Sequence, residues 1–175
     1  MINSTMGLKK IYVAEATGTD DANTGYTFPV AGAAWNDLGD VYKDSCTLVD
    51  DDPEETSHES ETSSKVITLS GKINTNVTLQ LMDPDLEQLA RYFGGIITTV
   101  GEKKAWIRPR KLPYKEWAIK LIPEEGVMVQ CANVRITPKF NITYSATGIC
   151  LVDLTIKLQA QLGIDETAAD PTKTT

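Results

Sequence analysis

The clearest pattern of hydrophobic and polar positions lies in residues 71–82, where the two kinds of residue alternate. One parity carries the apolar side chains Ile73, Val77, Leu79 and Leu81, with Thr75 in step. A period of two predicts a β-strand that buries one face and exposes the other to water. The exposed face would consist of Lys72, Asn74, Asn76, Thr78 and Gln80.

A helical pattern follows this strand directly. Apolar residues recur at positions i, i+3, i+4 and i+7, namely Leu86, Leu89, Ala90 and Phe93. Asp83 is suited to cap the N-terminus, Pro84 suits the first helical position, and Gly94-Gly95 allows a left-handed exit. The sequence therefore predicts one short α-helix over about residues 84–93, with its Leu86, Leu89 and Phe93 face packed on a sheet.

The rest of the chain shows about seven to nine strand patterns in all and no further helix. They cover residues 8–15, 45–49, 65–70, 96–100, 117–121, 127–136, 140–144 and 149–162. In residues 127–136 the apolar parity changes, which predicts a β-bulge near Ala132-Asn133. Short connections and clean alternation favour antiparallel pairing. We expect a mainly β fold, an antiparallel β-sandwich or partly closed barrel with one short flanking helix.

The length of 175 residues predicts a single domain over residues 1–175, with its core in about 7–162. Small and polar residues dominate an N-terminal arm (1–7), a long connection (17–32), an acidic loop (50–64) and a C-terminal tail (163–175). We expect the tail to be disordered, and the arm, the connection and the loop to be mobile in an isolated subunit and to order on assembly.

The net charge of −7 limits the possible partners. Neutralising nucleic-acid phosphates requires a basic surface, so wrapping of nucleic acid is disfavoured. The sequence contains no run of about 18 apolar residues, so it predicts no membrane span. Residues 1–10 lack the apolar core of a signal peptide. Synthesis in the cytoplasm is the expectation.

Candidate catalytic or metal-binding groups are few. Cys46, Cys131 and Cys150 lie far apart, and the one histidine, His58, lies in an acidic run. We interpret the cysteines as buried reduced thiols, because neither a Cys–His pair nor zinc-ligand spacing is present. No phosphate-binding glycine loop and no nucleophile elbow occur. The sequence predicts a protein that is not an enzyme and needs no metal or cofactor.

Two segments concentrate charge of opposite sign. Residues 50–61 hold seven acids, without the glycine and spacing of an EF-hand, and read as an exposed loop or hairpin tip. The basic segment contains Lys103, Lys104, Arg108, Arg110, Lys111 and Lys115. Its neighbours Trp106, Tyr114 and Trp117 superficially suggest a platform for single-stranded nucleic acid. On an acidic protein we favour a solvated loop beside core aromatics.

The order of these elements resembles a known family. The likeness rests on residues 7–15 (GLKKIYVAE), residues 39–48 (GDVYKDSCTL), the acidic loop, the strand–Asp83-Pro84-Asp85–helix–Gly94-Gly95 unit and the long C-terminal strand. Over about residues 7–162 the chain resembles the major tail tube proteins of long-tailed bacteriophages and prophages. Related folds build the tubes of contractile tails and type VI secretion systems. We expect no appended immunoglobulin-like domain of the kind that the longest members carry.

The resemblance implies a structural protein of the virion tail, synthesised in the host cytoplasm. Its subunits would form hexameric rings, stacked into a tube that conducts DNA without binding it specifically. Its partners would be other copies of itself and the tail-tip, tape-measure and tail-terminator proteins. No catalytic residues are implied.

Such a tube needs strands with one apolar face for the subunit and one polar face for the channel. The strands at 71–82 and 149–162 fit, and the candidate channel residues are Asn74, Asn76, Thr78, Gln80, Thr155 and Gln159. On a monomer the same faces would simply be solvated, and periodicity does not separate the two cases.

Contacts between subunits could use the two charged segments. A head-to-tail contact joins two different surfaces, which opposite charges would steer and align. The candidate residues are Asp50, Asp51, Asp52, Glu54 and Glu55 on one side and Arg108, Arg110 and Lys111 on the other. The alternative is two independent solvated loops. The alternative function is a non-enzymatic β-sandwich binding module that recognises sugar through Trp35, Trp106 or Trp117.

Overall fold

The computed structural model describes residues 6–16, 20–21, 25–26, 35–59, 61–142, 148–160 and 162–165. These residues form one α-helix and fourteen strands. The strands are β1 (Met6–Glu15), β2 (Asp20–Asp21), β3 (Gly25–Tyr26), β4 (Asn36–Asp37), β5 (Thr47–Asp51), β6 (Glu55–Glu59), β7 (Val66–Ser70), β8 (Asn74–Met82), β9 (Ile96–Val100), β10 (Lys103–Ile107), β11 (Trp117–Glu125), β12 (Met128–Ile142), β13 (Cys150–Leu158) and β14 (Leu162–Asp165). The helix is α1 (Leu86–Phe93). The predicted mainly β fold with one helix is confirmed.

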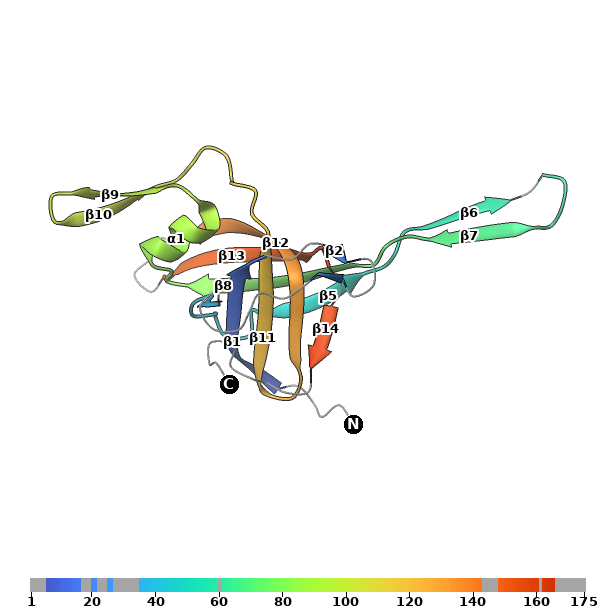
Figure 1. Ribbon diagram of the computed structural model, residues 1–175, viewed down its shortest axis with the longest axis horizontal. Coiled ribbons are helices and arrows are strands. Elements are labelled where there is room, and N and C mark those ends of the chain that lie inside the picture. Colours follow the sequence, from blue (N-terminus) through green and yellow to red (C-terminus); the bar gives the residue numbers. More distant parts are fainter. Residues whose placement is uncertain are drawn as a thin grey trace.

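One eight-stranded antiparallel sheet forms the body of the molecule, in the order β4-β1-β11-β12-β13-β8-β5, with β14 also paired to β12. The long strand β12 belongs to two layers. Its first part pairs with β11 and β14, and its second part pairs with β13. Figure 1 shows β1 and β11 running across the direction of β8 and β13. The end strands β4 and β5 do not pair with each other, so the sheet folds into a sandwich without closing into a barrel.

A β-bulge marks the place where β12 passes between the layers. Trp117 pairs with Val134 and Ile119 with Cys131, so β12 carries one extra residue opposite β11. This confirms the bulge predicted near Ala132-Asn133. The carbonyl of Asn133 accepts hydrogen bonds from the backbone N–H groups of Gln159 (2.9 Å) and Ala160 (3.2 Å), so β13 ends there.

The strand predicted at 149–162 is therefore divided, because its partner β12 changes layer. Its first part is β13, which ends at Leu158, and the chain resumes pairing as β14 beside the first part of β12. The expectation of a tail from residue 163 is corrected for residues 163–165, which belong to β14. The expectations for residues 1–5, 17–19, 22–24, 27–32 and 166–175 lie outside the described residues.

The hydrophobic core lies between the two layers. Val77, Leu79 and Leu81 of β8 are 1–2% exposed, as their alternation predicted. Ile73 differs, because β8 starts at Asn74 and Ile73 is 58% exposed. The other side chains of this core are Ile11, Val13, Leu38, Tyr92, Phe93, Trp117, Ile119, Leu121, Cys131, Val134, Ile136, Val152, Leu154 and Ile156. A second buried cluster consists of Tyr12, Ala14, Trp35, Ala118, Ile122 and Met128. Among the described residues, no helix has the length and apolar character to cross a membrane.

The helix starts two residues later than predicted. Its N-cap is Asp85, whose carboxylate accepts the backbone N–H of Gln88 (2.7 Å) while the Gln88 side chain accepts the N–H of Asp85 (3.0 Å). This reciprocal pair is a capping box. Asp83 instead adopts a left-handed turn conformation (φ 47°). Phe93 is buried as predicted, but Tyr92 is its buried neighbour, whereas Leu86 and Leu89 are half-buried.

Candidate assembly surfaces

Two two-stranded ribbons project from opposite ends of the molecule (Figure 1). At one end, β5 and β8 continue outward as β6 and β7, joined by a hydrogen bond from the Gly71 N–H to the Glu54 carbonyl (2.8 Å). We call β6 and β7 the acidic arm. Residues 50–72 around it contain seven acids and two lysines, a net charge of −5. The segment predicted as an exposed loop or hairpin tip thus lies in an exposed hairpin.

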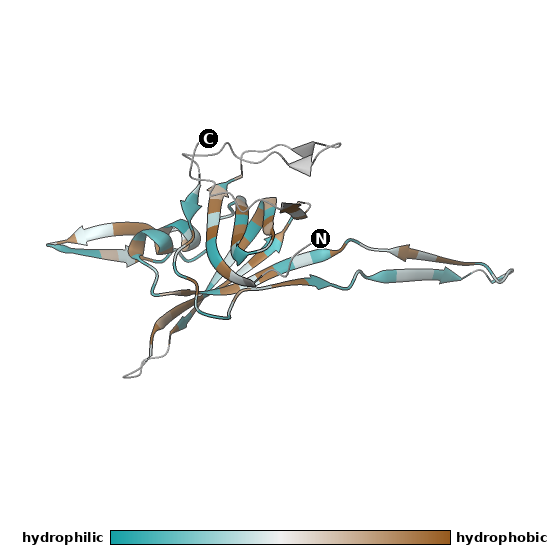
Figure 2. Ribbon diagram, turned by 90° about the horizontal axis from the view of Figure 1, so that it is seen from below, coloured by the Kyte–Doolittle hydropathy of each residue, from teal (hydrophilic) through white to brown (hydrophobic). Residues whose placement is uncertain are grey.

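The acidic arm has two different faces. Ile67 lies opposite His58, and Leu69 lies opposite Thr56. Directly opposed side chains share one face of a ribbon. Ile67 and Leu69 are 48% and 56% exposed, and Figure 2 shows hydrophobic residues along this ribbon. The other face carries Val66 with Glu59, Thr68 with Ser57 and Ser70 with Glu55.

At the other end, β9 and β10 form the second ribbon, which we call the basic arm. A two-residue turn that begins at Gly101 (φ 66°) connects the strands. Ile96 lies opposite Ile107, Thr98 opposite Ala105 and Val100 opposite Lys103. The large apolar side chains of this face, those of Ile96, Val100 and Ile107, are 58–72% exposed. The basic arm therefore also presents an uncovered apolar face.

The opposite face of the basic arm is fixed to the body at its root. The Trp106 indole donates a hydrogen bond to the Gly94 carbonyl (2.9 Å) and packs near Phe93 and Phe140 (5.7 and 5.8 Å between ring centroids). The Arg108 guanidinium lies over the same two rings, at 5.1 and 5.5 Å. These contacts hold the direction of the arm relative to α1.

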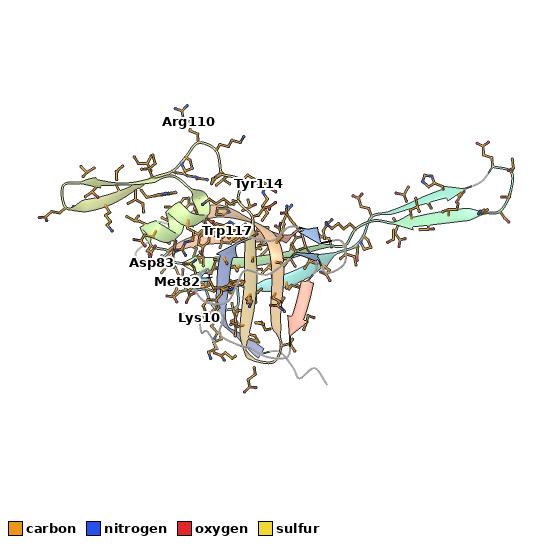
Figure 3. The ribbon with its side chains drawn as sticks, viewed as in Figure 1. Lys10, Met82, Asp83, Arg110, Tyr114 and Trp117 are labelled. Atoms are coloured by element: carbon orange, nitrogen blue, oxygen red, sulfur yellow. The ribbon has the colours of Figure 1, made fainter. Side chains whose placement is uncertain are left out.

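The loop after β10 completes the basic end. Residues 103–115 contain six basic residues and no acid. Arg110 lies at the outer bend of the loop and points away from the body, whereas Trp117 lies within it (Figure 3). Lys111 is exposed beside Arg110. All three predicted basic contacts are exposed, and Arg108 in addition lies over the aromatic rings of the root.

The predicted acidic contacts also divide into two groups. Asp50 accepts a hydrogen bond from the Thr75 hydroxyl (2.5 Å), and Asp51 accepts one from the Asn76 amide (2.8 Å). Both carboxylates thus brace β5 against β8. Asp52, Glu54 and Glu55 lie farther out and are exposed.

A polar face covers β12, β13, β8 and β5 on the side away from the core. The register places four threonines in one row across these strands: Thr137, Thr155, Thr78 and Thr47. Beside this row, the Gln80 amide donates to Asp153 (2.7 Å). The predicted channel residues Asn76, Thr78, Gln80 and Thr155 lie on this face. Thr47 and Thr137 were missed, because alternation within one strand does not reveal which strands are neighbours.

The remaining predicted channel residues lie at the edge of the polar face. Asn74 pairs with Asp51 near the acidic arm. Gln159 follows the end of β13 and borders a hollow of about 410 Å³ together with Asn74 and Asn76. The structure thus brings all six candidate residues to one side of the sheet.

The other candidate chemistry has little geometric support. Trp35 and Trp117 are 5% and 4% exposed, and the Trp106 ring packs at the arm root, so these indoles offer no open platform for a sugar. Burial raises the pKa of the Cys46 and Cys131 thiols, which disfavours a reactive thiolate. Cys131 is buried, whereas Cys46 and Cys150 are half-buried. Within the described ranges, no group of three His, Cys, Asp or Glu could hold a metal ion.

Comparison with protein families and with curated proteins finds no match. Similar solved structures include the tail of an empty gene transfer agent particle with C6 symmetry (TM-score 0.46, 15% identity, 91% of this chain and 96% of that chain). A second is the virion of a native gene transfer agent particle (TM-score 0.42, 15% identity, 74% of this chain and 88% of that chain). A third is an anti-feeding prophage cap that terminates a tube (TM-score 0.41, 13% identity, 95% of this chain and 95% of that chain).

These neighbours are tail, virion and tube-cap structures.

Proposed function

We propose that this protein is a structural subunit of a phage-type tail tube, which self-assembles into stacked hexameric rings around a DNA-conducting channel. One observation carries the proposal: two ribbons of opposite charge, each with an uncovered apolar face, project from opposite ends of one compact body. The ring of six and the stacking follow the sequence resemblance.

Opposite ends of opposite charge suit an assembly that continues from copy to copy. A heterologous contact joins one surface of a copy to a different surface of its neighbour. Each neighbour then still has its other surface free to bind a further copy. Glu54 and Glu55 at the acidic end face solvent, as do Arg110 and Lys111 at the basic end. A guanidinium grips a carboxylate through two hydrogen bonds, which would fix the register of this contact.

The polar sheet face supports the channel role. It carries hydroxyl and amide side chains together with charges of both signs, Arg135, Lys139 and Lys157 beside Asp51 and Asp153, with the neutral threonine row between them. Binding to DNA phosphates depends on dense positive charge. A channel lined by this face would therefore let DNA pass without specific binding.

The proposal extends to location and partners. The protein would reside in the virion tail after synthesis in the host cytoplasm. Tail-tip, tape-measure and tail-terminator proteins would contact the two ends of the tube, by the same resemblance.

Charge reversal tests the head-to-tail contact. Light scattering would follow assembly of the wild type, Glu54→Lys/Glu55→Lys, Arg110→Glu/Lys111→Glu, and an equimolar mixture of the two variants. Arg108 is left intact because it packs at the arm root. Each variant by itself should assemble less well than the wild type. In the mixture, the reversed charges of the two variants are complementary, so one of the two possible contacts should form again. Near 1 M salt, where the Debye length is about 3 Å, the differences should shrink. If neither variant changes assembly or its salt dependence, the charged ends do not form the contact.

A further inference from the structure

We infer that the acidic arm of one copy packs its apolar face against the apolar face of the basic arm of the next copy. The inference rests on the proposed function, and it names a contact that the charges alone do not specify. The two faces are that of Ile67 and Leu69 and that of Ile96, Val100 and Ile107.

Neither apolar face has a partner surface within the described part of the chain. β6 and β7 pair only with each other, and all ten of their residues are exposed. A two-stranded hairpin is marginally stable in water without a covering surface. Continuous exposed apolar patches mark interaction sites. The acidic arm therefore lacks a covering surface within the described part of the chain, and a second molecule would supply one.

The basic arm is complementary to it in three respects. Both ribbons have five residues in each strand, all paired in register. Each has one apolar face, and the segments that contain them carry charges of −5 (residues 50–72) and +5 (residues 96–115). Stacked ribbons lie about 10 Å apart, which is about one Debye length, so Glu55 and Glu59 of the acidic arm remain close enough to attract Lys103 and Lys104 of the partner ribbon.

The identity of the occupant follows from where the two arms lie. They project from opposite ends of the long axis, so they cannot cover each other within one copy (Figure 1). An arm-on-arm contact between copies covers both apolar faces at once, and it repeats without closing on a pair. A second copy of this chain is thus the partner that accounts for both arms.

Cysteine cross-linking tests the contact directly. In a Cys46→Ser/Cys150→Ser background, Ile67→Cys chains and Ile107→Cys chains would be purified separately, mixed, assembled and oxidised. The Val66→Cys chain is the matched control, because Val66 is similarly exposed (55%) on the other face of the same strand. We expect mixed disulfide dimers from the Ile67→Cys and Ile107→Cys pair, and few from the Val66→Cys and Ile107→Cys pair.

The outcomes separate this inference from the proposed function. Assembly without mixed dimers, equal cross-linking of the Val66→Cys control, or dimers from Ile67→Cys chains alone would overturn the arm-on-arm contact and leave tube formation intact. If the wild-type chain does not assemble at all, both proposals fail.

A second measurement avoids disulfide chemistry. Ile67→Asp/Leu69→Asp should raise the critical concentration for assembly about tenfold or more, while circular dichroism of the monomer stays unchanged. Val66→Asp, on the other face, should change it far less. Equal effects of the two variants would contradict a face-specific contact.

Discussion

The body and the acidic arm are successive parts of one two-stranded ribbon, yet they bury very different amounts of apolar surface. In the body, Val77, Leu79 and Leu81 of β8 lie beneath the second layer and are 1–2% exposed, whereas the edge strand β5 beside it is exposed throughout. Past Gly71, the same ribbon continues as β6 and β7, where Val66, Ile67 and Leu69 are 48–56% exposed. Apolar side chains stabilise a fold only where something covers them. The core of the body is buried within one chain, whereas the proposed contact would cover the arm with a second copy.

The largest expected effect is on the body. Phe93 is fully buried and stacks on Phe140 (4.5 Å between centroids) at the junction of α1 and the basic arm. Phe93→Ala should lower the free energy of unfolding by about 3–5 kcal/mol, because it leaves a cavity. Ile96→Ala, three residues later on the exposed arm face, should change it by less than about 0.5 kcal/mol. Denaturant melts of the monomer would measure the free energy of unfolding of both variants. Similar losses for Phe93→Ala and Ile96→Ala would contradict the contrast between a buried body and an exposed arm.

Alkaline pH should destabilise the body through Tyr92. Burial raises the pKa of Tyr92 to about 12, whereas an unfolded tyrosine titrates near 10. The unfolded chain loses this proton first as the pH rises, so the free energy of unfolding falls between about pH 10 and 12, by about 2–3 kcal/mol. Tyr92→Phe should lack this fall in the free energy of unfolding. Subtracting its pH profile of stability from that of the wild type isolates the contribution of Tyr92. Parallel profiles would contradict the burial argument.

A smaller effect is expected at the start of α1. Asp85→Ala removes the capping box and should cost about 1 kcal/mol in thermal or chemical melts. Asp83→Asn is the matched control, because asparagine tolerates the left-handed conformation there and Asp83 does not cap the helix. A larger loss from Asp83→Asn would mean that the helix begins earlier.

The acidic arm should show the weakest protection from amide hydrogen exchange in the monomer. In the monomer, amide exchange of β6 and β7 should be close to that of an open chain, because their hydrogen bonds are exposed to water. In assembled material the same amides should exchange much more slowly, whereas β8 and β13 should be protected in both states. Equal protection of the arm in monomer and assembly would contradict its role as a contact.

Local patterns in the sequence predicted much of the body. The alternation in β8, the stripe ending at Phe93 and the parity change at Ala132-Asn133 each reflect contacts between near neighbours, and all three are present. The helix start was misplaced because Asp83 and Asp85 both precede a helical stripe, and only the backbone conformation distinguishes them.

Features that depend on distant parts of the chain could not be predicted. The division of β13 from β14 follows from β12 changing layer, and the threonine row depends on the register of four strands. The apolar arm faces were missed for a similar reason. Ile67 and Leu69 alternate with polar residues just as core strands do, and only the folded structure shows that no layer covers them.

Electron microscopy of the purified chain over a rising concentration series tests the central claim, self-assembly through the two ends, most directly. The proposed function predicts rings and stacked, hollow tubes that appear above a critical concentration, with the same subunit repeat along the whole tube. A chain that stays monomeric at every concentration, with its fold intact by circular dichroism, would contradict it.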